Sequence, residues 1–140
     1  MTAKSKVLLW LISVVAAFLL GLVPQYVQKQ ELRGELQTAN DRLMSIQSEA
    51  QLAESRDLCG LMLLEALRKN YGSAKDYSGN YFEKVRQAME NPKNSSRRKG
   101  MEELITNRDS ITSSLAQGDA ASASQIQALC ARTYEVTRNQ

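Results

Sequence analysis

One run of apolar residues near the start of the chain constrains its fold more than any other feature. Residues 7–23 read VLLWLISVVAAFLLGLV and contain no charge. A helix rises about 1.5 Å per residue, so a helix over residues 7–27 would reach across the roughly 30 Å hydrocarbon core of a bilayer. The run predicts a transmembrane signal-anchor helix over residues 7–27, preceded by a short basic tail over residues 1–6. The lipid bilayer is therefore the first expected partner.

A cleaved signal peptide is the alternative interpretation of the same run. The run is longer than the usual core of about 7–15 residues, and no A-x-A-like pair of small residues follows it, which favours an uncleaved anchor. Lys4 and Lys6 in the tail favour an orientation that leaves the C-terminal domain outside the cytoplasm. The opposite orientation stays open, because basic residues on the two sides of the run are nearly balanced. The expected localisation is a single-pass protein of the inner (cell) membrane with an extracytoplasmic C-terminal domain.

The rest of the 140-residue chain has the composition of a helical protein. After the apolar run, good helix formers dominate, Pro92 is the only proline after Pro24, and no strand-type alternation of apolar and polar residues occurs. The predicted fold class is all-α. It comprises a coiled-coil-like stalk over residues 28–56 and a small helical bundle over residues 57–140.

Apolar or small residues recur along the stalk with alternating spacings of four and three, which is typical of a coiled-coil seam. Two interpretations remain open. The stalk could pair with a second copy, or it could be one amphipathic helix that folds back onto its own C-terminal helices. Alanines bury less apolar area than leucines and weaken an isolated coiled coil. The possible self-association seam consists of Leu32, Leu36, Ala39, Leu43, Ile46, Ala50 and Ala53.

Four helical segments are expected in the bundle. Residues 58–67 are apolar almost all round and are predicted to be buried between other helices. Gly72 and Ser73 predict a helix stop followed by a new start, and a single helix over residues 101–115 ends at Gly118. Ser122 and Gln125 have the spacing of a capping box for the last helix. The buried face of that helix is predicted to be Ile126, Leu129, Cys130, Thr133, Tyr134 and Val136, whereas Phe82 in the second segment is predicted to be partly exposed.

The stretch KNYGSAKDY over residues 69–77 resembles the turn of a tetratricopeptide helix hairpin. The resemblance covers about thirty residues once, whereas solenoids need roughly three repeats. It departs from the pattern at Met62 and Glu65, where a small residue and an aromatic residue are usual. The resemblance implies a local helix hairpin and a protein-binding role.

Cys59 and Cys130 both lie on apolar faces of predicted helices, with Gly60 beside the first. Either both are buried thiols, since free Cys behaves as a small hydrophobe, or they form a disulfide that clips the long helix to the last one. The sequence leaves these two alternatives open.

The densest positive charge in the chain lies in the expected loop around residues 91–96 and just after it. The patch could bind lipid headgroups or an acidic protein, or it could be a solvated loop. This possible anionic-partner patch consists of Lys93, Arg97, Arg98 and Lys99.

The inventory of reactive residues argues against an enzyme. The chain has no His and only two Cys, so it lacks the commonest general base and any zinc motif, and it has no glycine-rich phosphate loop. Residues 28–140 hold 16 basic and 15 acidic residues, a balance that does not favour nucleic acid. We expect no catalytic residue, cofactor, metal or small-molecule substrate. The expected function is a protein–protein interaction or scaffold module that self-associates or binds a membrane protein; the alternatives are a helical sensory domain for a small ligand and an accessory subunit of a membrane complex.

Overall fold

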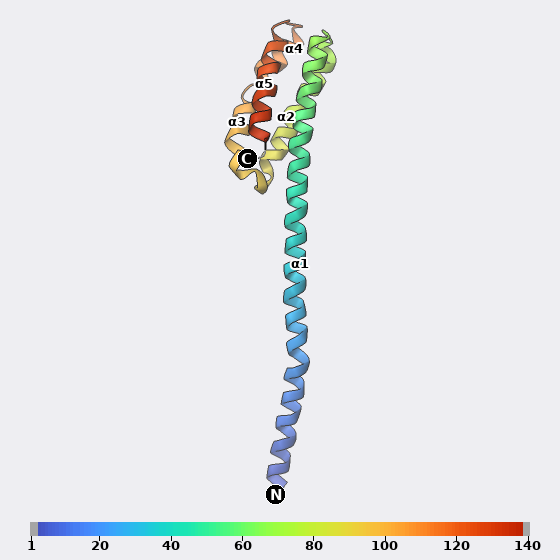
Figure 1. The fold of residues 1–140 in the computed structure, drawn as a ribbon, viewed down its shortest axis with the longest axis vertical. Helices are drawn as coiled ribbons and strands as arrows, with labels where there is room; N and C mark the ends of the chain where they lie inside the picture. The colour runs from blue at the N-terminus through green and yellow to red at the C-terminus, as the bar shows by residue number, and fades with distance from the viewer. Residues whose placement is uncertain (1–2, 139–140) are drawn as a thin grey trace. The chain divides into compact units, whose positions relative to one another are not determined.

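The computed structural model describes residues 3–138, which form helices joined by short turns; side chains are described for residues 10–18 and 32–138. No strand occurs among the described residues, so the all-α prediction is confirmed. Figure 1 shows the elements in chain order. They are α1 (Ala3–Leu67), α2 (Tyr71–Glu90), the 3₁₀ helix η1 (Pro92–Arg97), α3 (Arg98–Ile105), α4 (Arg108–Ala116) and α5 (Ser122–Thr137).

The chain divides into two units, Met1–Arg42 and Leu43–Gln140. The first unit consists of the N-terminal part of α1, where the Thr38 hydroxyl donates a hydrogen bond of 2.9 Å to the Gly34 carbonyl. The second unit holds the rest of α1 and every later element. Residues 43–56, which the sequence assigned to the stalk, therefore belong to the same unit as the bundle.

The described residues correct the expected localisation. No helix formed by them is both long and apolar enough to cross a membrane, which overturns the prediction of a single-pass membrane protein with a spanning helix over residues 7–27. Within the expected span, side chains are described for residues 10–18. The side chains of residues 3–9 and 19–31, and all of residues 1–2, lie outside the described part, as do the predicted roles of Lys4 and Lys6.

The core of the second unit forms where the later helices cover one side of α1 (Figure 1). Helix α2 packs against η1, α3 and α4, and α5 packs against α3 and α4. A disulfide and several side-chain bonds join α1 to α2, η1 and α5. The largest fully buried apolar side chains are those of Tyr81, Leu52, Met62, Met101, Leu104, Leu115 and Ile126.

The segment 58–67 is not buried all round, contrary to the prediction. Cys59 and Met62 are buried, but Leu61 and Leu64 are each 41% exposed and Leu67 is 64% exposed. The segment is apolar on both sides, as the sequence shows, but the bundle covers only one side of this helix. The other side keeps its leucines at the surface.

The turn after α1 uses different residues from those predicted. Lys69, with φ of 62°, takes the left-handed conformation expected of Gly72. Its N–H donates to the Ala66 carbonyl at 3.0 Å, and the Asn70 N–H donates to the Glu65 carbonyl at 2.9 Å, the two bonds of a Schellman motif. Helix α2 then begins at Tyr71, and Gly72 and Ser73 lie inside it. The helix hairpin implied by the tetratricopeptide resemblance is thus present, two to three residues earlier than expected.

The predicted single helix over residues 101–115 is two helices, α3 and α4. Asn107 interrupts it, because its side-chain amide donates to the Glu103 carbonyl at 3.0 Å, as the Thr106 hydroxyl does at 2.7 Å. The predicted end at Gly118 is confirmed: its φ is 66°, and its N–H donates to the Leu115 carbonyl at 3.1 Å.

Three predictions about single side chains in the bundle are wrong. Ser122 is the first residue of α5 and does not cap it; the Asp119 carboxylate instead accepts from the Ala121 N–H at 2.9 Å. Tyr134 is 61% exposed, and Phe82 is only 3% exposed. Phe82 is buried because its ring packs edge-on against Tyr81, with centroids 4.9 Å apart.

Candidate functional site

The predicted seam lies on the surface of α1 in both units. In the first unit, Leu32 and Leu36 are 58% and 63% exposed; in the second, Leu43 and Ile46 are 65% and 66% exposed. Ala39 and Ala50 are exposed and Ala53 is half-buried. No other described element of the chain covers the four large residues. We call these seven residues, Leu32, Leu36, Ala39, Leu43, Ile46, Ala50 and Ala53, the outer stripe.

A second stripe on α1 faces the bundle. Its members are buried and follow the same alternation of four and three, and we call them the inner stripe. A helix turns by about 100° per residue, so residues nine positions apart point in nearly opposite directions. The inner stripe consists of Ser48, Leu52, Ser55, Cys59, Met62 and Ala66, each 3% exposed or less.

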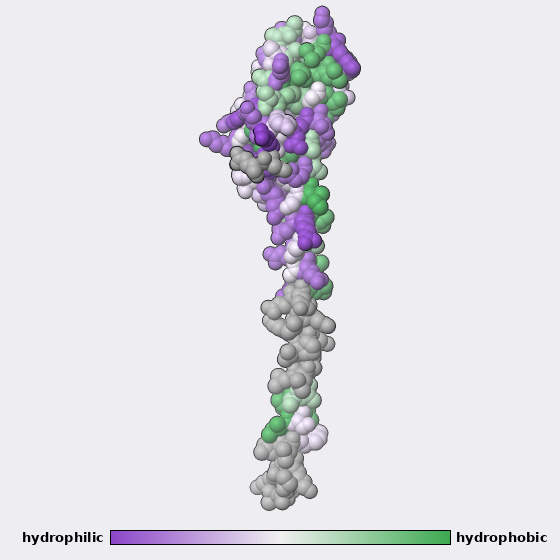
Figure 2. Space-filling model, viewed as in Figure 1, coloured by the Kyte–Doolittle hydropathy of each residue, from purple (hydrophilic) through white to green (hydrophobic). Residues whose placement is uncertain are grey.

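Residues of the two stripes that are nine positions apart lie on opposite sides of α1. Leu43 of the outer stripe lies opposite Leu52, and Ile46 lies opposite Ser55. The same relation places Leu61 opposite Leu52 and adds it to the exposed side. Figure 2 shows hydrophobic surface along α1 in the second unit, beside hydrophilic surface. Apolar residues of this size that remain at the surface in a row are typical of a contact surface.

Polar bonds fix the beginning of the inner stripe to η1. The Ser48 hydroxyl donates to the Asn94 side-chain carbonyl at 2.7 Å, and the Asn94 amide donates to the Ala88 carbonyl at 2.9 Å. The Asn91 amide donates to the Met44 carbonyl at 3.3 Å. Because Ser48 and Asn94 are buried, their mutual bond satisfies groups that would otherwise be costly to desolvate.

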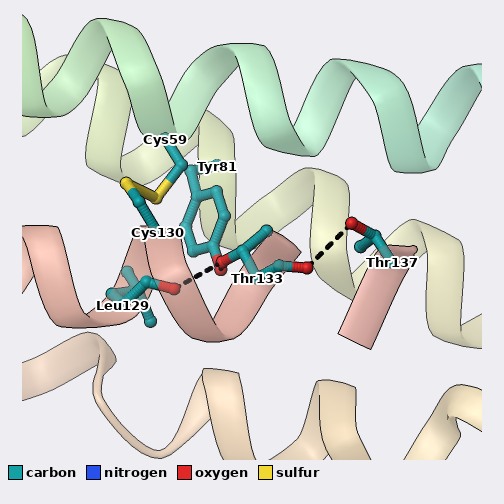
Figure 3. Close-up of a disulfide and its surroundings, with 6 residues drawn as sticks. All are labelled: Cys59, Tyr81, Leu129, Cys130, Thr133 and Thr137. Atoms are coloured by element: carbon teal, nitrogen blue, oxygen red, sulfur yellow. Dashed lines mark hydrogen bonds between the residues drawn. A yellow bond between two sulfur atoms is a disulfide. The ribbon is translucent and has the colours of Figure 1, made fainter. Parts of the chain in front are cut away.

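The structure brings the two cysteines together as a disulfide between α1 and α5, with Cα atoms 5.6 Å apart (Figure 3). No described cysteine is a free thiol. Because the bond closes a loop with a sequence separation of 71, it removes much of the freedom of the unfolded chain. The disulfide holds the inner stripe against α5, while Leu43 and Ile46 on the same part of α1 stay exposed.

Tyr81 lies beside the disulfide, and its ring reaches from α2 to α5 (Figure 3). Its hydroxyl lies 2.6 Å from the Thr133 hydroxyl, which itself donates to the Leu129 carbonyl at 2.8 Å. Since Thr133 has one hydroxyl proton, Tyr81 is the donor of the shared bond. Burial raises the pKa of Tyr81 to about 12, although the bond to Thr133 acts in the opposite direction. The phenol is therefore a structural group held neutral.

The predicted anionic-partner patch begins in η1, and two of its members bond to neighbouring groups. The Arg97 guanidinium lies 3.9 Å from the Glu49 carboxylate and donates to the side-chain carbonyl of Asn94 at 3.4 Å. The Arg98 guanidinium donates to the Met89 carbonyl at 3.2 Å. Lys93 and Lys99 are exposed. The patch stays a prediction, and part of its charge serves to fix η1.

Two exposed carboxylates near the bundle surface are held ionised by arginines. Arg132 bonds to Glu103 at 2.8 Å and to Glu135 at 2.9 Å, and its bond lowers the pKa of Glu103. The bonds from Arg86 and then Gln87 lower the pKa of Glu83 in the same way. These are surface ion pairs of a folded bundle.

The described surface has shallow hollows of moderate size. One of about 410 Å³ is bordered by Asn107, Gln125 and Arg132, and one of about 360 Å³ by Arg97, Arg132 and Arg138. No group of three or more possible metal-ligating side chains occurs among the described residues. The alternative of a small-ligand sensory domain stays a prediction.

Sequence reasoning missed the inner stripe and its polar bonds. The spacing of Ser48, Ser55 and Ala66 is visible in the sequence, but serine and alanine do not identify a helix face as buried. The pairing of Tyr81 with Thr133 joins residues 52 positions apart and had no signal in one sequence. Comparison with known protein families, with curated proteins and with solved structures finds no match to this chain.

Proposed function

We propose that this chain is a protein–protein interaction module that self-associates through the outer stripe of α1. One observation supports the proposal most directly: four large aliphatic residues of the stripe, Leu32, Leu36, Leu43 and Ile46, are each more than half exposed. Their heptad spacing is the pattern by which helices pair. Burial of apolar area is the main driving force of such pairing.

The bundle supports this function by fixing one side of α1. Its disulfide and the Ser48–Asn94 bond fix the inner stripe, so the helix cannot rotate to bury the outer stripe against its own bundle without breaking them. The fold-back alternative would bury the outer stripe, whereas here the bundle covers the inner one. The exposed side chains of Leu43 and Ile46 are thus accessible to a partner outside the chain, which supports the proposal.

Sedimentation equilibrium of the full chain tests the proposal. We expect a concentration-dependent dimer, and we expect Ile46→Glu to convert it to a monomer because a buried, unpaired carboxylate at a pairing position is strongly unfavourable. Tyr134→Glu is the matched control, since Tyr134 is 61% exposed against 66% for Ile46 and lies on α5. Unchanged helical content in both variants excludes unfolding. A wild-type chain that stays monomeric at all concentrations would overturn the proposal.

A further inference from the structure

We infer that the bundle binds an acidic segment of a partner protein where η1 and α3 meet the C-terminal end of α5. The surface that carries the inference is a hollow of about 360 Å³ bordered by three arginines, Arg97, Arg132 and Arg138. We call it the arginine hollow. All of its residues belong to the second unit, and none belongs to the outer stripe. The inference is therefore independent of the proposed self-association and adds a second surface to the chain.

A glycine allows α3 to lie close to the end of α5 (Figure 1). A Cβ atom at Gly100 would lie only 2.8 Å from a methyl carbon of Val136, so any larger residue there would push the two helices apart. Gly100 and Val136 both line the arginine hollow. Their contact brings Arg97, from the end of η1, to the same hollow as the two arginines of the C-terminal segment.

Arg138 supplies a guanidinium that has no partner among the described residues. It is exposed and forms the C-cap of α5, where its backbone N–H donates to the Tyr134 carbonyl at 2.9 Å. No hydrogen bond or ion pair joins its side chain to another described side chain or carbonyl. A guanidinium has five donors in a planar fork that matches the two oxygens of a carboxylate. Arg138 is thus available to pair with a carboxylate of a partner.

The other two arginines are held in place by acidic residues and stay accessible. Arg132 bonds to Glu103 at 2.8 Å through one nitrogen and to Glu135 at 2.9 Å through another, yet its side chain is 49% exposed. Arg97 lies 3.9 Å from the Glu49 carboxylate, and its side chain is 22% exposed. These pairs orient the guanidinium groups before a partner arrives, so less side-chain freedom is lost on binding.

The surroundings of the arginine hollow add positive charge. The residues that line it include three arginines and one acid, Glu135. Arg98 and Lys99 begin α3 next to Arg97 and are exposed. Arg56 borders a neighbouring hollow of about 190 Å³, which Arg138 also lines. An excess of one charge around a hollow attracts and orients a partner of opposite charge.

The mixture of charges favours a protein segment over a nucleic acid or a membrane. Glu103 and Glu135 both bond to Arg132, so a uniformly negative phosphate surface would meet these carboxylates as well as the arginines. A peptide carries its carboxylates among neutral residues and can pair with each arginine separately. The volume of about 360 Å³ lies near the lower end of the range of about 300–1,000 Å³ for ligand pockets, which suits a few side chains.

Fluorescence anisotropy of a labelled peptide of alternating glutamate and alanine tests the inference on the full chain. We expect binding that weakens as salt is added, because salt screens exposed charges. Arg138→Gln should raise the dissociation constant about fivefold, which corresponds to about 1 kcal/mol. This variant removes no described side-chain bond, so the fold should be unchanged. Arg68→Gln is the matched control, because the Arg68 side chain is 63% exposed and does not line the arginine hollow.

Three results would overturn the inference. The first is no binding of the peptide even at low salt. The second is an equal loss in Arg138→Gln and Arg68→Gln, which would show attraction by overall charge alone. The third is tighter binding of a single-stranded oligonucleotide, or of vesicles that contain phosphatidylserine, which would assign the arginine hollow to phosphate groups. The proposed self-association does not depend on any of these results, because sedimentation of the outer-stripe variant measures it separately.

Discussion

The inner and outer stripes of α1 have the same spacing but differ in residue size and in exposure. In the second unit the buried inner stripe contains two serines, a cysteine and an alanine together with Leu52 and Met62. The outer stripe there consists of Leu43, Ile46 and two alanines, and Leu43 and Ile46 are 65% and 66% exposed. The bundle therefore covers the face that contains the polar residues, and two large aliphatic residues stay exposed on the other.

Under the proposed function, the two stripes of α1 serve folding and association separately. Small residues let neighbouring helices lie close, since the distance between helix axes depends on the side chains at the contact. The disulfide and the Ser48–Asn94 bond stabilise that contact together with the buried side chains of Leu52 and Met62. Leu43 and Ile46 stay exposed on the other side of α1. Variants on the inner stripe should change the stability of the monomer, whereas variants on the outer stripe should change association.

Removal of the disulfide should have the largest effect on the inner stripe. For Cys59→Ala/Cys130→Ala we expect a loss of about 4 kcal/mol in the free energy of unfolding, because the loop with a separation of 71 becomes unconstrained in the unfolded chain. Urea denaturation of the double variant measures it. Reduction should destabilise the wild-type chain and leave the variant unchanged. Equal stability of variant and oxidised wild type would contradict the role of the disulfide.

The variants Leu52→Ala and Leu61→Ala truncate the same type of side chain on the two opposite sides of α1. Leu52 is fully buried, so its truncation should cost about 3 kcal/mol through lost burial and the cavity left behind. Leu61 is 41% exposed on the opposite side and should cost much less. Denaturation midpoints of the two variants at one concentration give the comparison. If the two costs are equal, the assignment of inner and outer faces is wrong.

Alkaline pH should weaken the contact between α2 and α5 through Tyr81. Because burial raises the pKa of Tyr81 to about 12 in the folded chain against 10.0 ordinarily, both states are neutral below pH 10 and its contribution is complete there. Above pH 10 the unfolded chain ionises first, and roughly 2.7 kcal/mol is lost as pH rises to about 12. Tyr81→Phe should remove this component from the pH dependence of stability. A variant with the same pH profile as wild type would show that Tyr81 ionises freely.

Arg132→Gln should have the smallest effect, because it changes only exposed ion pairs on the surface of the bundle. The bond from Arg132 lowers the pKa of Glu103, so its contribution is present at neutral pH and is lost as pH falls through the lowered value. We expect a small destabilisation at pH 7 that disappears in acid, measured by thermal denaturation at both pH values. The same loss in acid would indicate a packing effect of the Arg132 side chain instead.

The sequence allowed much of the helical architecture to be predicted, but few of its boundaries. Ile126, Leu129 and Thr133 in α5 are buried as their spacing indicated, and Gly118 ends α4. The start of α2 was missed because Lys69 takes a left-handed conformation that the sequence assigned to Gly72. The break at Asn107 was missed because its amide competes with the helix for backbone carbonyls.

By itself the sequence determined that the chain is helical and that α1 has a heptad stripe, because both depend on local propensity and periodicity. Only the tertiary structure decided which side of α1 the bundle covers. That choice depends on contacts between distant residues, such as Cys59 with Cys130 and Ser48 with Asn94, whose partners no local pattern identifies. The bundle buries the side of α1 on which Leu52 and Met62 gain apolar burial and Ser48 and Cys59 find specific partners, and it leaves Leu43 and Ile46 exposed.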